Sequence, residues 1–249
     1  MTDLPSTHQR FAEHDFRVGH VISEAFSVLS RNFLAFFIVT VIAYLPALLL
    51  SQISAGDGTD VGAGIAAGLL GVLLMLVFSM LSQAVIVHAA FQNMRGRPVQ
   101  LGDALNVAMQ RFFPILGVAV LTAILAGLGM LALLVPGFIL LIMWFVAIPV
   151  CVVEQRGAWA SMQRSAELTK GHRWKIFGMM ILLVIISLVV SPLIGLIVAF
   201  GGPVIIFVVN LIWTAIWGAF YAIVAVVSYH DLRAAKEGID IEQIAGVFD

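Results

Sequence analysis

The fold class is decided by residues 112–153, FFPILGVAVLTAILAGLGMLALLVPGFILLIMWFVAIPVCVV, which contain no charged side chain. A helix needs about 20 apolar residues to cross a hydrocarbon core of about 30 Å, so this segment is long enough for two crossings. Val135-Pro136-Gly137 lies near its middle and has the composition of a turn. We therefore expect a transmembrane hairpin made of the helices Phe113–Val135 and Gly137–Val153.

The composition of the whole chain also indicates a membrane protein. Of its 249 residues, 61% are hydrophobic and 11% are charged, and the mean hydropathy is +1.07. Soluble domains are about 45–50% apolar and about 25% charged, so lipid must be the solvent for much of this chain. The single cysteine, Cys151, excludes an internal disulfide, and a net charge of −1 gives no overall basic character for nucleic acid.

Six apolar segments predict an all-α, polytopic transmembrane bundle of six helices. Lipid requires helices or closed barrels, and these runs are continuously apolar, without the alternation of a barrel strand. The predicted spans are Phe33–Ser51, Val61–Phe91, Phe113–Val135, Gly137–Val153, Trp174–Phe200 and Val204–Tyr229. Residues 1–32 then form an N-terminal segment with an interfacial helix, residues 33–229 the six-span domain, and residues 230–249 a C-terminal tail.

The positions of Lys and Arg predict the orientation. They occur in the N-terminal segment, the two longer loops between hairpins, the start of a span, and the tail. None occurs in the three loops within the hairpins. Under the positive-inside rule, both termini and both basic loops face the cytoplasm. The first 20 residues are polar and lack the apolar core of a cleavable signal, so we expect insertion through the first span.

A short amphipathic stretch precedes each predicted pair of spans: Val18–Phe33, Leu101–Phe113 and Ala158–Trp174. Each ends in an aromatic residue, which suits a helix lying at headgroup depth. One interpretation is a threefold repeat of an interfacial helix followed by a transmembrane hairpin. The other is that any loop entering a membrane span has this composition.

Two further patterns leave alternatives open. Small residues recur at four-residue spacing, and they indicate close helix packing either within this chain or with a partner. They are Gly64 and Gly68; Ala119, Ala123 and Gly127; Ser187, Ser191, Gly195 and Ala199; and Thr214, Gly218 and Ala222. Pro46, Pro149 and Pro192 lie within predicted spans, where each either kinks the helix or breaks it.

No catalytic or metal-binding motif is visible in the sequence. Between the membrane interfaces the spans contain no Asp, Glu, Lys or Arg, no histidine pair has metal-binding helical spacing, and no nucleophile elbow or phosphate-binding loop occurs. We therefore expect no enzyme activity, no cofactor and no metal. Gln83 and Asn210 are the candidate intramembrane polar residues; for Asn210 the alternatives are an interhelical hydrogen bond and a contact with substrate.

The second basic loop contains the candidate contacts for lipid headgroups or a partner: Glu154, Arg156, Arg164, Lys170, His172, Arg173 and Lys175. Glu154 ends the fourth predicted span and could pair with Arg156, Arg164 or Arg173. Gly171 is placed as a helix C-cap. The loop is either a pocket for anionic headgroups or an anchor with a structural ion pair. In the tail, we expect the last helix to stop at Gly238, with a short amphipathic turn after it.

Several short segments resemble the glycerophosphoryl diester phosphodiesterase membrane-domain family. They are Gly96-Arg97-Pro98-Val99, Leu101–Leu105, Val135-Pro136-Gly137, Trp144–Glu154, Arg164–Gly171 and Tyr229–Arg233. In the proteins that give the family its name, such a region is joined to a soluble phosphodiesterase barrel, and no segment here is long enough for that barrel. The resemblance implies a stand-alone module of the bacterial inner membrane, without the phosphodiesterase activity.

Three hypotheses for function follow. The first is a non-catalytic membrane module, an accessory or scaffold subunit that binds lipid, with anionic headgroups on the cytoplasmic face, or that binds a membrane-protein partner or a second copy. The second is a transporter or exporter of a hydrophobic or zwitterionic substrate, with Gln83, Asn210 and broken helices around a central path. The third is a lipid enzyme that uses interfacial residues such as Glu154, His172 and His230. Substrate, partner and oligomeric state do not follow from the sequence.

Overall fold

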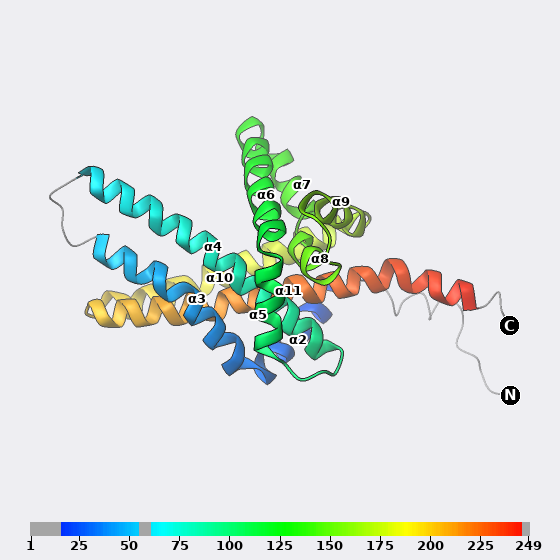
Figure 1. Cartoon of the computed structure of the whole chain (residues 1–249), viewed down its shortest axis with the longest axis horizontal. Coiled ribbons are helices and arrows are strands. Elements are labelled where there is room, and N and C mark those ends of the chain that lie inside the picture. Colours follow the sequence, from blue (N-terminus) through cyan, green and yellow to red (C-terminus); the bar gives the residue numbers. More distant parts are fainter. Residues whose placement is uncertain (1–15, 55–60, 246–249) are drawn as a thin grey trace.

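The computed structural model describes residues 16–54 and 61–245, and every regular element within them is a helix (Figure 1). This confirms the predicted all-α fold. The helices are α2 (Val18–Arg31), α3 (Phe33–Ser54), α4 (Val61–Met94), α5 (Leu101–Gln110), α6 (Phe112–Ala132), α7 (Leu134–Met143), α8 (Ala147–Val153), α9 (Ala158–Thr169), α10 (Arg173–Ala199) and α11 (Pro203–Ala245).

Five stretches of the described chain are long and apolar enough to cross a membrane: Leu73–Met94, Phe112–Ala132, Leu134–Val153, Arg173–Leu196 and Val204–Glu237. The pair α2 and α3 makes a sixth if the two helices are counted together. The predicted spans therefore correspond to α3, α4, α6, α7 with α8, α10, and α11. These helices are compatible with a multi-pass membrane protein.

The order of a short helix followed by two long segments occurs three times: α2 before α3 and α4, α5 before α6 and α7–α8, and α9 before α10 and α11. The first short helix lies almost at right angles to its span, with an angle of 86° between α2 and α3. Asn32 forms this corner, because its backbone leaves the helical region (φ −123°, ψ 24°) and its side chain donates to the Val28 carbonyl at 3.2 Å. A helix that lies in the membrane interface must be nearly perpendicular to the span that follows it, as α2 is to α3.

Two of the short helices, α2 and α5, bury small residues and expose some large ones. In α5, Ala104 and Ala108 are buried, whereas Leu105 and Met109 are more than half exposed. In α2, Phe26 is exposed in the same way. Beside lipid, a helix can present small residues to protein and large apolar residues to the acyl chains. On these helices, the apolar face predicted from the sequence therefore contains two surfaces: small residues that pack against protein and large residues that are exposed.

The turn between α6 and α7 lies at Leu133, whose backbone is extended (φ −161°, ψ 137°). The prediction of a turn at Val135-Pro136-Gly137 is therefore wrong by two residues. Pro136 and Gly137 belong to the first turn of α7, where proline is tolerated because its missing N–H has no partner to lose. The turn predicted at Gly201-Gly202-Pro203 is confirmed, with Pro203 as the first residue of α11.

The three span prolines behave differently from one another. α3 and α10 continue through Pro46 and Pro192 without interruption. The fourth span is broken at residues 144–146, between α7 and α8, and Pro149 is the third residue of α8. Pro149 cannot donate to the carbonyl four residues earlier, so the helix restarts there.

The last helix is longer than expected. α11 continues through Gly238 to Ala245, so the predicted stop at Gly238 and the separate turn after it are wrong. A single glycine costs about 1 kcal/mol inside a helix, which the flanking residues can offset. At 1.5 Å per residue, the 43 residues of α11 span about 65 Å, about twice the hydrocarbon thickness.

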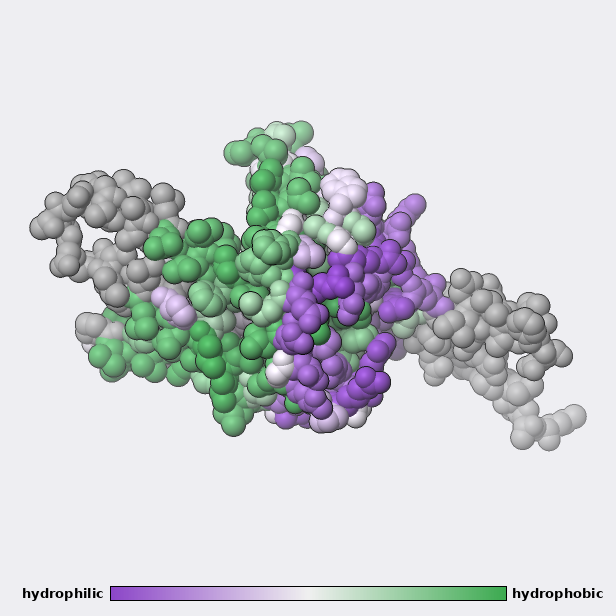
Figure 2. All heavy atoms as spheres, viewed as in Figure 1, coloured by the Kyte–Doolittle hydropathy of each residue, from purple (hydrophilic) through white to green (hydrophobic). Residues whose placement is uncertain are grey.

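Hydrophilic and hydrophobic residues gather on opposite sides of the visible face in Figure 2. Hydrophobic residues cover the α6–α7 hairpin and the coloured parts of α3, α4 and α10, and hydrophilic residues gather on the side of the molecule that carries the short helices α2, α5 and α9. We call the region formed by residues 16–31, 92–111, 154–175 and 229–237 the polar end. The candidate site lies there.

Candidate functional site at the polar end

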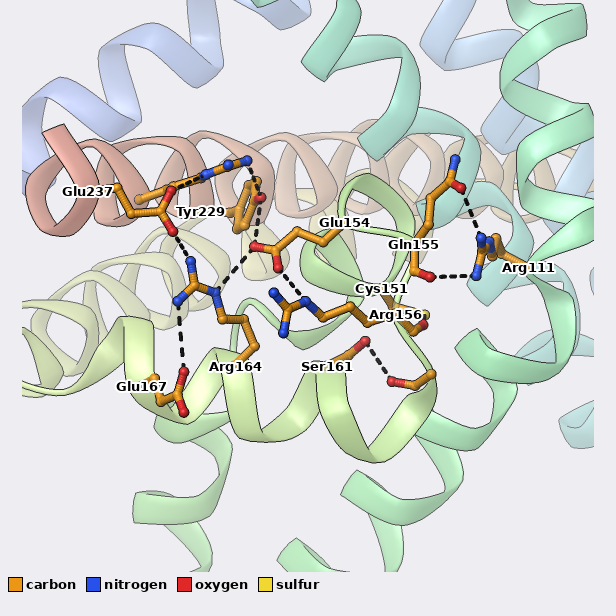
Figure 3. Close-up of polar contacts among 12 residues, drawn as sticks. Arg111, Cys151, Glu154, Gln155, Arg156, Ser161, Arg164, Glu167, Tyr229 and Glu237 are labelled. Carbon is orange, nitrogen blue, oxygen red and sulfur yellow. Dashed lines mark hydrogen bonds and ion pairs between the residues drawn. The ribbon is translucent and has the colours of Figure 1, made fainter. Parts of the chain in front are cut away.

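Glu154 is the centre of a network of polar contacts (Figure 3). It caps α8, and its side chain is only 9% exposed. Its Oε2 lies 2.7 Å from Arg156 Nε, and its Oε1 lies 3.4 Å from Arg164 Nε. The Tyr229 hydroxyl donates to Oε1 at 3.1 Å. Two of the three pairings predicted for Glu154 are thus confirmed, and a carboxylate this buried requires such partners.

Arg164 connects this carboxylate to two other acidic residues. Its Nη2 pairs with Glu237 Oε1, and its Nη1 lies 3.8 Å from Glu167 Oε2. Because Arg164 comes from α9 and Glu237 from α11, the guanidinium joins the α8–α9 loop, α9 and the extension of α11. The planar fork of arginine suits this role, because its nitrogens point in several fixed directions.

Tyr229 and Arg233 complete the network from α11. Arg233 Nη1 donates to the Tyr229 hydroxyl oxygen at 3.2 Å, and Arg233 Nε donates to Glu237 Oε2 at 2.5 Å. Tyr229 is completely buried, so its hydroxyl needs both of these partners. The sequence could not indicate these contacts, because α11 is some 75 residues away from Glu154 along the chain.

The break between α7 and α8 positions α9. Because the helix stops at Met143, the carbonyl of that residue is free to accept hydrogen bonds from outside. Ser165 donates to it at 2.8 Å and Thr169 at 3.4 Å, both from the buried face of α9. This explains why α9 buries serine and threonine rather than a purely apolar stripe, and why its amphipathic pattern is the weakest of the three.

A second contact fixes the loop before α9. Arg111, between α5 and α6, donates through Nη1 to the Gln155 carbonyl at 2.7 Å and through Nη2 to the Gln155 side chain at 2.9 Å. Gln155 has a positive φ of 55°, and this forked contact holds it in that uncommon conformation. The second and third repeats are joined at this point.

The α9–α10 turn carries the remaining predicted residues. Gly171 has a φ of +94° just beyond the end of α9, which confirms its predicted C-cap position. Lys170 is exposed, Lys175 is partly buried, and the His172 ring lies edge-on against buried Phe16 with 6.1 Å between centroids. Phe16, just before α2, was not singled out in the sequence, and it ties the first repeat to this turn.

The polar end remains electropositive after its internal pairs are formed. Residues 154–175 and 229–237 hold seven cations and four carboxylates, a formal excess of three positive charges with the histidines neutral. The Lys236 amine donates a hydrogen bond to the backbone carbonyl of Glu167 rather than to a carboxylate. Such an excess attracts anions at the surface, and it is largest around the α9–α10 turn.

The intramembrane candidates lie away from this site. Asn210 is exposed on α11, and its amide donates to the Ile206 carbonyl of the same helix at 2.9 Å. The interhelical bond considered for it is therefore not the one that forms. Gln83 is partly buried in α4. Neither residue lies within the Glu154 network.

The candidates for lipid chemistry are engaged separately. Glu154 is held by two arginines and a tyrosine, His172 contacts Phe16, and His230 Nδ1 lies 3.5 Å from Asp231. These contacts orient the three side chains toward different neighbours. Within the described part of the chain, no group of three or more His, Cys, Asp or Glu residues could hold a metal ion.

An apolar groove of about 700 Å³ opens beside the α9–α10 turn, between α7 and α10. Its walls include Ile139 and Ile142 of α7 and Phe177, Ile181 and Val184 of α10, and Arg173 and Trp174 lie at the start of α10. The groove thus combines an apolar wall with a cation from the predicted headgroup site.

Residues 115–232 of the chain match the sequence profile of a family described as a domain of unknown function (DUF7847). The match covers just under half of the chain and runs from α6 to the polar part of α11, so it includes Glu154, Arg164 and the α9–α10 turn. No curated protein and no solved structure matches the chain. The chain is therefore similar to this family over its second and third repeats, and the similarity carries no activity.

Proposed function

We propose that this protein is a non-catalytic integral membrane module, an accessory or scaffold subunit that binds anionic phospholipid headgroups or a membrane-protein partner at its polar end. The observation that supports this most is the cationic excess around the α9–α10 turn, beside an apolar groove. Cations next to apolar surface match the two halves of a phospholipid. The ion-pair network of Glu154 and Arg164 holds α8, α9 and α11 in fixed positions beneath those charges.

We further propose that the protein resides in the bacterial inner membrane, with both termini in the cytoplasm. The distribution of Lys and Arg supports this orientation under the positive-inside rule. The resemblance to stand-alone members of the glycerophosphoryl diester phosphodiesterase membrane-domain family supports the location. The family name refers to proteins in which the membrane region is joined to a phosphodiesterase barrel. In a stand-alone member, the membrane region by itself would bind the lipid or the partner.

The transporter hypothesis receives no comparable support. It required Gln83, Asn210 and proline-broken helices around one path. Asn210 instead lies on the exposed side of α11, and α3 and α10 are continuous at Pro46 and Pro192. The scaffold proposal uses the residues that the structure does bring together.

The proposal is tested on the full-length, tagged protein purified in mild detergent. We expect native mass spectrometry to detect bound anionic phospholipid or a reproducible membrane-protein partner. Lys170→Glu should reduce the amount bound, because it reverses one exposed charge at the turn, whereas Arg97→Glu, an equal change on the exposed α4–α5 loop, should have a smaller effect. A preparation that is monomeric, free of lipid and free of partners would refute the proposal.

A further inference from the structure

We infer that the groove between α7 and α10 is a binding site for one anionic phospholipid, with an acyl chain along the groove and the phosphate at Arg173. This inference deepens the proposed function and rests on it. It assigns the headgroup to one arginine and the chain to one pair of helices.

The groove has the length of one bilayer leaflet. On α10 it extends from Arg173 to Ile185, twelve residues further on, which corresponds to about 18 Å of helix. Half of a hydrocarbon core of about 30 Å is about 15 Å. A chain that starts at headgroup depth therefore reaches the far end of the groove near the bilayer midplane.

The Arg173 end of the groove lies at the depth of the headgroups. Trp174 is 85% exposed beside Arg173, and tryptophan in that position is typical of the membrane–water interface. The remaining lining residues named above are aliphatic or aromatic, so the cation stands at one end of an apolar surface. Charge and apolar surface are therefore arranged in the same order as in a phospholipid.

Arg173 also has a donor available for an anion. Its Nε is buried, and it has no hydrogen-bond partner within the described part of the chain. A buried, unsatisfied donor is costly, and the cost is removed if an acceptor binds there. A phosphate oxygen is a suitable acceptor, because guanidinium and phosphate match in geometry and in charge. Arg173 is also the first residue of α10, where free backbone N–H groups favour an anion.

The groove persists because α10 packs loosely. Only 11% of its membrane-spanning window is buried, and in the facing helix α7 only Gly137 and Ile142 are buried. Along α10 the side chains of Val184, Ile185 and Leu188 are each at least half exposed. Such a helix leaves room between itself and α7 that surrounding lipid fills, and Arg173 favours an anionic lipid over a zwitterionic one at that place.

The test uses the full-length protein in detergent, with phosphatidylglycerol or phosphatidylcholine added and the bound fraction measured by native mass spectrometry. The wild type should bind phosphatidylglycerol more tightly than phosphatidylcholine. Arg173→Gln should weaken phosphatidylglycerol binding about tenfold, since one charge-assisted hydrogen bond is lost, and should leave phosphatidylcholine binding nearly unchanged. Arg173→Lys, which keeps the charge, should restore part of the preference.

Ile181→Trp tests the groove independently of charge. A larger side chain on the wall should reduce the binding of both lipids at this site. Leu193→Trp should not, because Leu193 is exposed, does not line the groove and lies about 120° around the helix from Ile181. Arg97→Gln is the matched control for charge, because it removes an exposed cation away from the groove. Unchanged melting midpoints of the purified variants show that each of them is folded.

The outcomes separate the two proposals. If the wild type binds phosphatidylglycerol but neither Arg173→Gln nor Ile181→Trp weakens it, headgroups bind elsewhere on the polar end and the groove inference is overturned. If only Arg173→Gln weakens binding, the arginine contacts headgroups without a chain in the groove, which also overturns it. If the wild type binds neither phospholipid, the groove inference fails, and the proposed function then depends on a protein partner alone.

Discussion

At the scale of single residues, the polar end depends on how Glu154 is neutralised. Its carboxylate accepts from Arg156, Arg164 and Tyr229, and it is almost enclosed by them. Arginines that are 48% and 20% exposed remain partly hydrated, so this network lies between a surface ion pair and a buried one. Its contribution to stability should accordingly be moderate.

We expect Glu154→Gln to destabilise the protein by about 1–3 kcal/mol, because Arg156 loses its counter-charge and Arg164 loses one of three, while the shape of the side chain is kept. Thermal unfolding in detergent, followed by circular dichroism, measures the change. Asp103→Asn is the control, since it removes an exposed carboxylate in the first turn of α5. The double variant Glu154→Gln with Arg164→Gln should lose less than the sum of the single losses. Strict additivity would show that the two side chains are not coupled.

The sequence predicted this site in part, and distance along the chain explains which part. Arg156 and Arg164 lie two and ten residues from Glu154, so their pairing could be inferred from the loop itself. Tyr229 and Glu237 reach the same place from α11, and nothing in their local sequence indicates that. A tyrosine near the end of a span is equally typical of an interfacial anchor.

At the scale of elements, the α6–α7 hairpin depends on glycine for close packing. A Cβ at Gly137 would lie 2.6 Å from the backbone nitrogen of Met130, and a Cβ at Gly129 would lie 3.1 Å from the Gly137 Cα. The small-residue pattern in the sequence included Gly127 but not Gly129, and Gly129 is the one of the two that makes a close contact. The sequence could not show that Gly129 contacts Gly137, because Gly137 was predicted to be part of the turn between the two helices.

Gly137→Ala should therefore destabilise the hairpin by about 1–3 kcal/mol, because the added methyl group meets backbone that cannot move aside. Gly127→Ala is the matched control in the same hairpin, since a Cβ there has open space within 4 Å. It should be neutral or slightly stabilising, because alanine favours helix over glycine. Thermal unfolding of both variants checks this, and an equal effect of the two would contradict the close approach of α6 and α7.

The contact of α9 with the broken fourth span gives a second prediction for an element. Ser165→Ala removes the 2.8 Å hydrogen bond to the Met143 carbonyl and leaves only the longer one from Thr169. We expect a loss of about 1 kcal/mol, measured by thermal unfolding. Ser23→Ala, at an exposed position of α2, should change stability by less than about 0.5 kcal/mol. If Ser165→Ala lowers stability no more than the control does, the Met143 carbonyl does not depend on the hydrogen bond from α9.

At the scale of the whole molecule, the three units of a short helix and two long segments pack together along their spans and are also joined at the polar end. Within the spans, α11 packs against α3, where a Cβ on Gly218 would lie 3.4 Å from the Tyr44 hydroxyl. At the polar end, three contacts join the units. Arg111 with Gln155 joins the second repeat to the third, Phe16 with His172 joins the first to the third, and His20 lies 3.1 Å from Asp231. The outer ends of the α6–α7 hairpin and of α10 are largely exposed. Continuous apolar runs predicted the long helices, but these joints involve residues far apart in sequence and could not be predicted from one chain.

This arrangement predicts which sites on an intact cell are accessible. The polar end carries the cations and should face the cytoplasm, so the α10–α11 turn should face the opposite side. In a Cys151→Ala background, Gly202→Cys should react with a membrane-impermeant maleimide in intact bacterial cells whose outer barrier has been removed. Arg97→Cys, exposed on the α4–α5 loop, should react only after the inner membrane is permeabilised. Cys151 is buried, so its replacement removes background labelling without exposing a new site. Labelling of Arg97→Cys before permeabilisation would place the basic end outside, where the anionic lipids of the cytoplasmic leaflet could not reach Arg173.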